Sequence, residues 1–327
     1  ELGIFRQLLP SELRSELGLE SEGVVGDFFR DVGLVIKADS EILPGRVAEL
    51  KARKRITRDE ITGDPLAEQP NDAELVVLAK LIYPLGRRPQ QLSIQAPTGK
   101  TANIGFVAYH RGLPVNDFRY LAEVVTLNLN WDDPWYSEFQ NRNLRRQNAA
   151  PMAAYLYVEP YEVRKEIIVR PVDLQNWIDL ELDGSETIPI EAQERIKEKV
   201  AEFLLDKNPL SIDRATATPT LDRIHFIRRT LRSTGIIEPP EPLPLTSATL
   251  GVIFHYPIDQ LPKEVAMRWE LFTPRIQTIR AATSDEAGSL PGEITEEDPE
   301  LTWTNYLQNP TAAKLRSVPP PEAARTI

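Results

Sequence analysis

The middle of the chain contains a run, at 151–171, in which apolar and charged residues alternate from Tyr161 onward. The alternation predicts two sides of one strand, an apolar side with Tyr161, Val163, Ile167 and Val169 and a polar side with Glu162, Arg164, Glu166 and Arg170. A repeat of two residues is typical of a strand with one buried face. Because strand-rich sequence lies on both sides of this run, we expect two β layers or two β domains to meet there.

Proline supports a β-rich chain. The sequence has 28 Pro and 16 Gly, and many of the prolines bracket strand-like runs. Proline breaks the interior of helices but is tolerated at strand ends, at sheet edges and in turns. This composition therefore favours many short strands with many connections.

Similar patterns predict further strands and one helix. The expected strands are at 75–83, 91–96, 102–110, 125–131, 153–161, 224–229, 248–256, 264–272, 276–281 and 301–306. Seven residues separate 248–256 from 264–272, so we expect these two strands to form an antiparallel pair. An acidic loop is expected at 284–300. At 190–207 the apolar residues repeat at helical spacing, which predicts an amphipathic helix.

These patterns together predict a mainly β fold. A length of 327 residues leaves room for about two domains. We expect two β-sandwich-like parts with one inserted amphipathic helix and an irregular N-terminal extension. The expected boundaries are an extension or docking arm at 1–71, a first β-sandwich-like domain at 72–172, a second β-rich domain at 173–308 and a proline-rich linker at 309–327.

The formal net charge of −11 argues against nonspecific binding to nucleic acids or anionic membranes, which needs a basic surface. One segment, 49–58, is locally basic, with the cations Lys51, Arg53, Lys54, Arg55 and Arg58. These side chains could bind a phosphate or a protein partner. The preferred interpretation is the solvated face of a helix, balanced by the acidic residues at 59, 60 and 64.

The sequence lacks the motifs of several kinds of catalytic, phosphate-binding and metal-binding site. The absence of cysteine excludes disulfides, thiolate zinc sites and cysteine nucleophiles. The run Gly99-Lys100-Thr101 is the end of a phosphate-binding loop, but Ile94 stands where that loop needs glycine, so a turn is expected. The three histidines have no partners at metal-ligand spacing, and no Gly-x-Ser-x-Gly elbow is present. We therefore expect no metal ion, no cofactor and no catalytic residues.

The most unusual composition is at 130–139, where aromatic rings and carboxylates are adjacent. The candidate ligand-binding residues are Trp131, Asp132, Asp133, Trp135 and Tyr136. Rings that stack on sugar C–H surfaces, beside carboxylates that accept hydroxyl protons, suit a carbohydrate site, and paired carboxylates can also hydrolyse glycosides. The alternative is a structured turn in which Trp131 completes its strand and Trp135 closes the end of a sandwich.

The sequence therefore predicts a non-catalytic structural or interaction domain with protein partners, as an extracytoplasmic part of a bacterial envelope or membrane-associated assembly. The first residue is Glu1, which either a cleaved export signal or an engineered or partly ordered start would explain, and the tail at 317–327 suggests a linker to another segment. No apolar run approaches the roughly 18–20 residues of a spanning helix, so membrane association is expected only through partners or a missing segment. The alternative function is a carbohydrate-binding module or glycoside-active enzyme.

Overall fold

The computed structural model describes residues 35–59, 65–70, 75–95, 104–121, 123–146, 150–229 and 234–306. Most of the expected N-terminal extension and the whole of the expected linker at 309–327 lie outside these residues. The chain divides into two compact units, one comprising Glu1–Ala149 with Arg228–Gly235 and the other Ala150–Ile227 with Ile236–Ile327. The boundary at 149/150 precedes the alternating run at 151–171, which belongs to the second unit.

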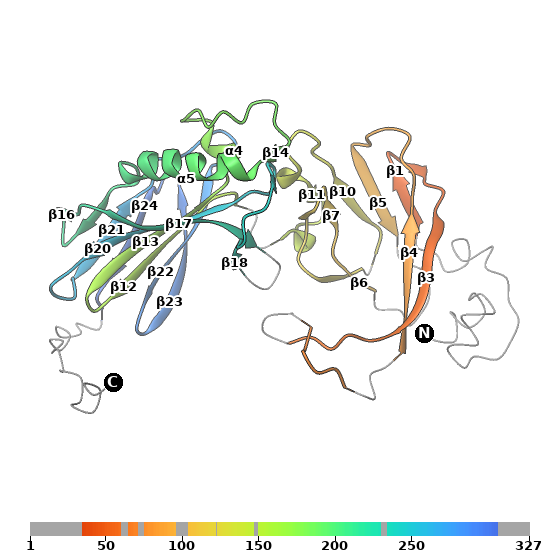
Figure 1. Ribbon diagram of the computed structural model, residues 1–327, viewed down its shortest axis with the longest axis horizontal. Coiled ribbons are helices and arrows are strands. Elements are labelled where there is room, and N and C mark those ends of the chain that lie inside the picture. The colour runs from red at the N-terminus through yellow and green to blue at the C-terminus, as the bar shows by residue number, and fades with distance from the viewer. Residues whose placement is uncertain are drawn as a thin grey trace, which may run out of the picture. The chain divides into compact units, whose positions relative to one another are not determined.

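The first unit is built on a five-stranded antiparallel sheet (Figure 1). In sheet order its strands are β11 (Glu138–Phe139), β10 (Val125–Asn128), β5 (Gln91–Gln95), β1 (Val35–Ala38) and β2 (Glu41–Ile42). Three antiparallel pairs accompany it: β3 (Arg46–Lys54) with β4 (Leu75–Ile82), β6 (Ile104–Phe106) with β9 (Arg119–Leu121), and β7 (Tyr109–His110) with β8 (Leu113–Pro114).

The core of this first unit is small, and β10 shows how it forms. Val125 and Leu127 are buried, whereas Thr126 and Asn128 on the other face of the strand are half-exposed. This is the period-two pattern that the sequence predicts for a strand with one buried face. The buried cluster consists of Val115, Leu121, Val125, Leu127, Phe139 and Leu144.

The second unit contains two larger sheets. The seven-stranded sheet has the order β18 (Thr234–Ile236), β17 (Thr220–Arg229), β20 (Leu250–Pro257), β13 (Glu162–Val169), β12 (Ala153–Glu159), β22 (Thr278–Asp285) and β23 (Gly288–Thr295). The end of β17 and most of β18 fall in the segment Arg228–Gly235, which the division of the chain assigns to the first unit. The four-stranded sheet has the order β16 (Ala215–Thr216), β15 (Leu210–Ile212), β21 (Glu264–Arg268) and β24 (Glu300–Thr304). A short pair joins β14 (Thr187–Ile188) to β19 (Leu243–Pro244).

The described residues of the second unit also form two helices, α4 (Pro171–Leu174) and α5 (Ile190–Leu205). Helix α5 lies along one side of the strands (Figure 1) and buries Ile196, Val200 and Leu204 at a spacing of four residues. These three side chains belong to the same apolar cluster as inward residues of both sheets. The mainly β fold with one long amphipathic helix is therefore confirmed. No helix among the described residues is long and apolar enough to cross a membrane.

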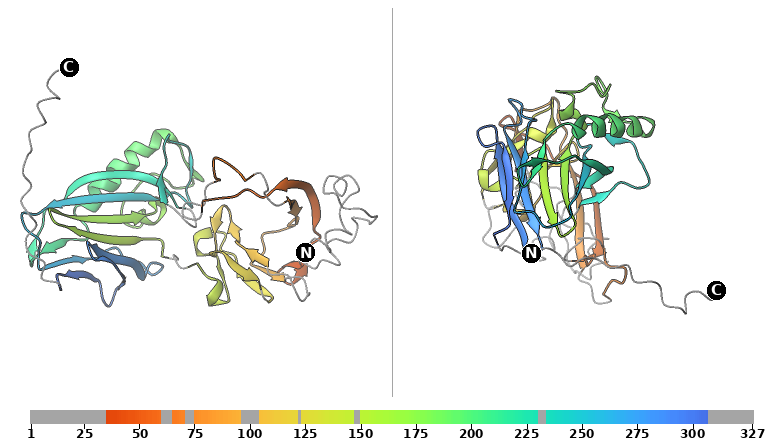
Figure 2. Two further views of the ribbon diagram at one scale, coloured as in Figure 1. Left: turned by 90° about the horizontal axis from the view of Figure 1, so that it is seen from below. Right: turned by 90° about the vertical axis from the view of Figure 1, so that its left-hand side faces the viewer.

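Two expected strand pairings differ from the structure. Strand β20 pairs with β13 and β17, whereas β21 pairs with β15 and β24 in the other sheet, so the predicted hairpin between 248–256 and 264–272 is wrong. The connection at 258–263 holds Pro262 and is too long for a tight turn, which lets the chain pass from one sheet to the other. The expected acidic loop at 284–300 instead contains β23, paired with β22 (both blue in Figure 2).

Strand β13 confirms the buried face of the central run but not all of its members. Val163, Ile167 and Val169 are fully buried. Tyr161, however, lies in the turn before the strand and is 41% exposed. Arg170, predicted on the polar side, is wholly buried just beyond the strand. The assignment of these last two residues to faces of the strand is therefore wrong.

The burial of Arg170 has a direct explanation in its partners. Its Nε and Nη2 donate to the two carboxylate oxygens of Asp173, at 2.6 and 2.8 Å, and its Nη1 donates to the main-chain oxygen of Thr246 at 3.3 Å. A buried guanidinium needs such acceptors because it has lost its water. Because Asp173 lies within α4, this bidentate ion pair also fixes the start of that helix.

Lys165 is a second buried cation, and it faces the core from β13. Its side chain is 1% exposed, and its Nζ donates to the main-chain oxygens of Lys207 and Asn208 at 3.2 and 2.9 Å. These carbonyls lie just after the end of α5. The ammonium also lies 5.0 Å from the ring centroid of Phe254 and 5.8 Å from that of Tyr256. Lys165 thus ties the C-terminal end of α5 to the centre of the large sheet.

We expect Lys165 to make the protein more stable as the pH rises from about 8 to about 10. Burial lowers the pKa of Lys165 from 10.5 to about 8, with the charge of Glu270 opposing the shift. In this window the unfolded chain keeps a proton that the folded chain has lost, so the free energy of unfolding rises, by about 3 kcal/mol at most. Above pH 10 the trend reverses, because burial raises the pKa values of Tyr157 and Tyr256.

Urea unfolding between pH 7 and 10 tests this expectation. The Lys165→Met variant should lose the rise, while Lys263→Met, which replaces an exposed lysine, should keep it. An equal rise in wild type and Lys165→Met would show that the buried lysine is not its source.

Candidate functional site

The segment at 130–139 is a structured turn that follows β10. The Asn130 side-chain oxygen accepts hydrogen bonds from the main-chain N–H groups of Asp132 and Asp133, at 3.1 and 2.9 Å. Asp133 then caps the short 3₁₀ helix Pro134–Tyr136 by accepting from the N–H of Trp135 at 3.0 Å. Local side-chain to main-chain bonds of this kind are the reason that Asn and Asp are favoured in turns.

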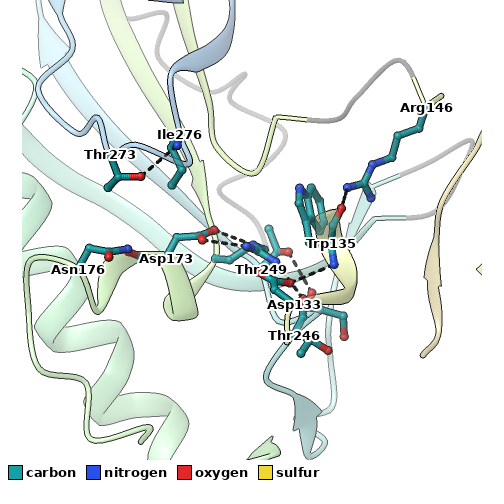
Figure 3. Close-up of polar contacts among 11 residues, drawn as sticks. Asp133, Trp135, Arg146, Asp173, Asn176, Thr246, Thr249, Thr273 and Ile276 are labelled. Atoms are coloured by element: carbon teal, nitrogen blue, oxygen red, sulfur yellow. Dashed lines mark hydrogen bonds and ion pairs between the residues drawn. The ribbon is translucent and has the colours of Figure 1, made fainter. Parts of the chain in front are cut away.

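Two of the five candidate residues have structural roles. Trp135 is 8% exposed, and the guanidinium of Arg146 lies 4.0 Å from its ring centroid. Arg146 also donates from Nη2 to the main-chain oxygen of Trp135 at 2.6 Å (Figure 3). Because the carboxylate of Asp133 caps the turn and the ring of Trp135 is buried, we assign neither of them to a ligand.

The other three candidates, Trp131, Asp132 and Tyr136, line an open depression of about 520 Å³. We call it the Trp131 depression; its remaining lining comes from Gln90, Gln91, Asn128, Leu129, Asn130 and Glu138. These residues flank β5 and β10, which are neighbours in the sheet. The sequence reveals the aromatic and acidic members of this group but not the amides, because Gln90 and Gln91 come from a segment about 40 residues earlier.

The ring of Trp131 is held in place on several sides. Its Nε1 donates to the main-chain oxygen of Pro89 at 2.6 Å. The ring of His110 meets it edge-on, with 4.6 Å between centroids and 85° between planes. The guanidinium of Arg88 lies 5.5 Å from the Trp131 centroid. These contacts determine the orientation of the ring before any ligand arrives.

Beneath the depression, His110 contacts Ser137. Nδ1 of His110 lies 2.7 Å from the hydroxyl oxygen of Ser137, which also accepts from the N–H of Asn130 at 2.9 Å. Both side chains are buried, at 5% and 3% exposure. A serine beside a histidine can act as a nucleophile with its base. Here the serine hydroxyl instead accepts the N–H of Asn130 and so stabilises the turn. His110 and Ser137 are 27 positions apart, so the sequence gives no signal for this contact.

We expect His110 to make folding sensitive to acid. Burial, with a smaller effect from the charge of Arg111, lowers the pKa of His110 below its ordinary value of 6.5. As the pH falls through 6.5 the unfolded chain takes up a proton at this histidine before the folded chain does, so stability is lost. Urea unfolding from pH 7.5 to 5.5 should show this loss, and His110→Phe should reduce it.

The half-exposed His225 provides the control for this measurement. The His225→Gln variant should keep the acid sensitivity of the wild type. If His110→Phe and His225→Gln changed the pH dependence equally, the assignment to His110 would be incorrect.

The basic segment is extended, not helical. Lys51, Arg53 and Lys54 lie in β3, and Arg55 and Arg58 follow it. The interpretation of these cations as one face of a helix is therefore wrong. β3 pairs along its length with β4, whose residues are apolar except for Lys80. The side chains of Lys54, Arg55 and Arg58 are exposed, and a role for the cluster in partner binding stays a prediction.

A second surface feature, a pair of exposed aromatic side chains, was not predicted from the sequence. Phe118 and Tyr120, at and beside β9, are 55% and 61% exposed, with their ring centroids 5.5 Å apart. Gly105 of β6 pairs with Tyr120, and a Cβ at Gly105 would lie 2.3 Å from Cζ of Phe118. The ring of Phe118 thus covers the glycine. We call Gly105, Phe118 and Tyr120 the Phe118 patch; its signal in the sequence is two aromatic residues two positions apart.

No protein-family model matches the chain, and no curated protein is significantly similar to it. Within the described part of the chain, no group of three or more histidine and carboxylate side chains is arranged to hold a metal ion. The assignment of function therefore depends on the two surfaces just described, the Trp131 depression and the Phe118 patch.

Proposed function

We propose that this protein is a non-catalytic structural or interaction domain that binds a protein partner through the Phe118 patch. The observation that supports this proposal is the exposure of two large aromatic side chains next to one another. Aromatic residues are enriched in protein–protein interfaces and in the few positions that supply most of the binding energy. Exposed apolar groups that lie together mark such sites more often than single exposed residues do.

The patch is presented on a stiff support. Between the two aromatic residues, Arg119 donates from Nη1 to the main-chain oxygen of Phe118 at 2.9 Å and from Nε to that of Asn143 at 3.3 Å. Its guanidinium also lies 3.8 Å from the carboxylate of Asp117. These contacts hold the main chain of β9 while both rings remain exposed. A surface that is ordered before binding loses less entropy when a partner covers it.

The size of the expected effect follows from the exposed area. A full aromatic side chain buries about 150–250 Å², and more than half of each ring is exposed here. At about 25 cal/mol per Å², covering the exposed part would contribute about 2–3 kcal/mol per ring. Two rings could then supply a large share of the affinity of a micromolar complex, which is about 8 kcal/mol.

Photo-crosslinking tests the patch directly. A photoreactive benzoylphenylalanine in place of Tyr120 should crosslink to a partner in native cells, and the Phe118→Ser change in the same chain should abolish the crosslink. The matched control carries the photoreactive group at Tyr109, which is 59% exposed but lies on β7, outside the patch. Equal crosslinking from both positions, or none from Tyr120, would contradict the proposal.

The proposal also places the protein outside the cytoplasm, in a bacterial envelope or membrane-associated assembly that it joins through its partners. The support for this location is the proline-rich β pattern of the sequence. A membrane-impermeant amine reagent provides the test, because Lys80 and Lys263 are exposed. Both should be labelled in cells whose inner membrane is intact. Labelling only after complete lysis would place the protein in the cytoplasm.

A further inference from the structure

We infer that the Trp131 depression binds a neutral saccharide. This inference concerns different residues from the Phe118 patch and does not depend on the proposed protein partner. Its volume of about 520 Å³ lies within the range of about 300–1,000 Å³ that is usual for small-ligand sites. The depression is open to solvent, which suits one unit of a longer chain that continues on both sides.

The lining groups match the surface of a sugar. A sugar ring offers apolar C–H faces together with hydroxyls that both donate and accept hydrogen bonds. Trp131 and Tyr136 supply aromatic surface for the C–H faces. The amides of Gln90, Gln91 and Asn128 provide donors and acceptors in the same depression, and the exposed carboxylate of Asp132 accepts only. A purely apolar ligand would leave these polar groups without partners, which costs binding energy.

The parts of this site are held in position before binding. Trp131 is fixed by its bond to Pro89 and by its edge contact with His110. The Asn130 side chain holds the main chain of Asp132. The Gln91 amide donates to the side-chain oxygen of Asn128 at 3.2 Å. A preformed arrangement lowers the entropy lost on binding, which matters for a shallow site that makes few contacts.

The charges of the site favour a neutral ligand over an anionic one. Of the described residues that line the depression, two are carboxylates, Asp132 and Glu138, and none is a lysine or an arginine. Arg145 lies 3.0 Å from Glu138, so part of the negative charge is already paired. A phosphate or a uronic acid would meet these carboxylates, and like charges at short range repel. The guanidinium of Arg88, 5.5 Å from the Trp131 centroid, is not part of the lining.

Titration of the purified full chain with neutral oligosaccharides tests the inference. The panel consists of cello-, xylo-, malto-, manno- and chito-oligosaccharides, with oligogalacturonate as the anionic comparison, and binding is followed by calorimetry and by tryptophan fluorescence. At least one neutral series should bind, and oligogalacturonate should bind more weakly. The fluorescence should respond because Trp131 is half-exposed in the depression. Of the other four tryptophans, Trp135, Trp269 and Trp303 are buried, and the half-exposed Trp177 lies in the second unit.

Two variants locate the site. Asp132→Asn replaces one acceptor oxygen and the negative charge by an amide NH2 group, and Gln91→Ala removes a side-chain amide. Neither touches the packing of Trp131, and each should weaken binding about tenfold, which corresponds to about 1.4 kcal/mol. The matched control is Asp206→Asn, an exposed aspartate just after α5, which should bind as the wild type does. Trp131→Ala is less informative because it also removes the contacts with Pro89 and His110.

Two outcomes would overturn the inference. The first is a wild-type protein that binds no member of the panel at millimolar concentration. The second is binding that Asp132→Asn and Gln91→Ala leave unchanged, since the sugar would then occupy another surface. Loss of saccharide binding in these variants should leave crosslinking through Tyr120 intact, so the inference and the proposed partner surface can fail separately.

Discussion

The second unit depends on the burial of the inner face of β13. This strand is hydrogen-bonded to β12 on one side and to β20 on the other, and its inward side chains belong to the core that both sheets and α5 share. One of those inward positions is Lys165. Its ammonium can stay there because two main-chain carbonyls after α5 accept its protons. The C-terminal end of α5 and the buried lysine of β13 therefore stabilise one another.

The first unit is stabilised in a different way. Its buried apolar cluster is small, and much of its order comes from side chains that bond to the main chain of loops. The carboxylate of Asp39 accepts from the N–H groups of Gln90 and Gln91, and Asn116 accepts from the N–H of Ala108. Such bonds give loops a defined shape without a large core. They also explain how the walls of the Trp131 depression, which are loops and strand ends, can be ordered for binding.

Both proposed surfaces lie in the first unit and are ordered by such side-chain to main-chain bonds. The Trp131 depression combines a fixed ring with amides whose positions are set by β5 and β10. The Phe118 patch combines two exposed rings with a main chain held by Arg119. Rigid loops and short strands that carry polar or aromatic groups are the usual places for recognition on β scaffolds. The buried Ser137–His110 pair supports the turn at the depression.

The sequence by itself determined the class of the fold and the main strands and helix. The period of two predicted β10, β12 and β13, and the helical period predicted α5, because these repeats follow from backbone geometry alone. Only the tertiary structure decided that β20 and β21 belong to different sheets, that Arg170 is buried against Asp173, and that Trp135 is buried while Trp131 borders a depression. The partners in these contacts come from distant segments or from the packing around a turn. The local pattern of apolar residues specifies which face of a strand or helix is buried. Long-range packing determines which other element that face contacts.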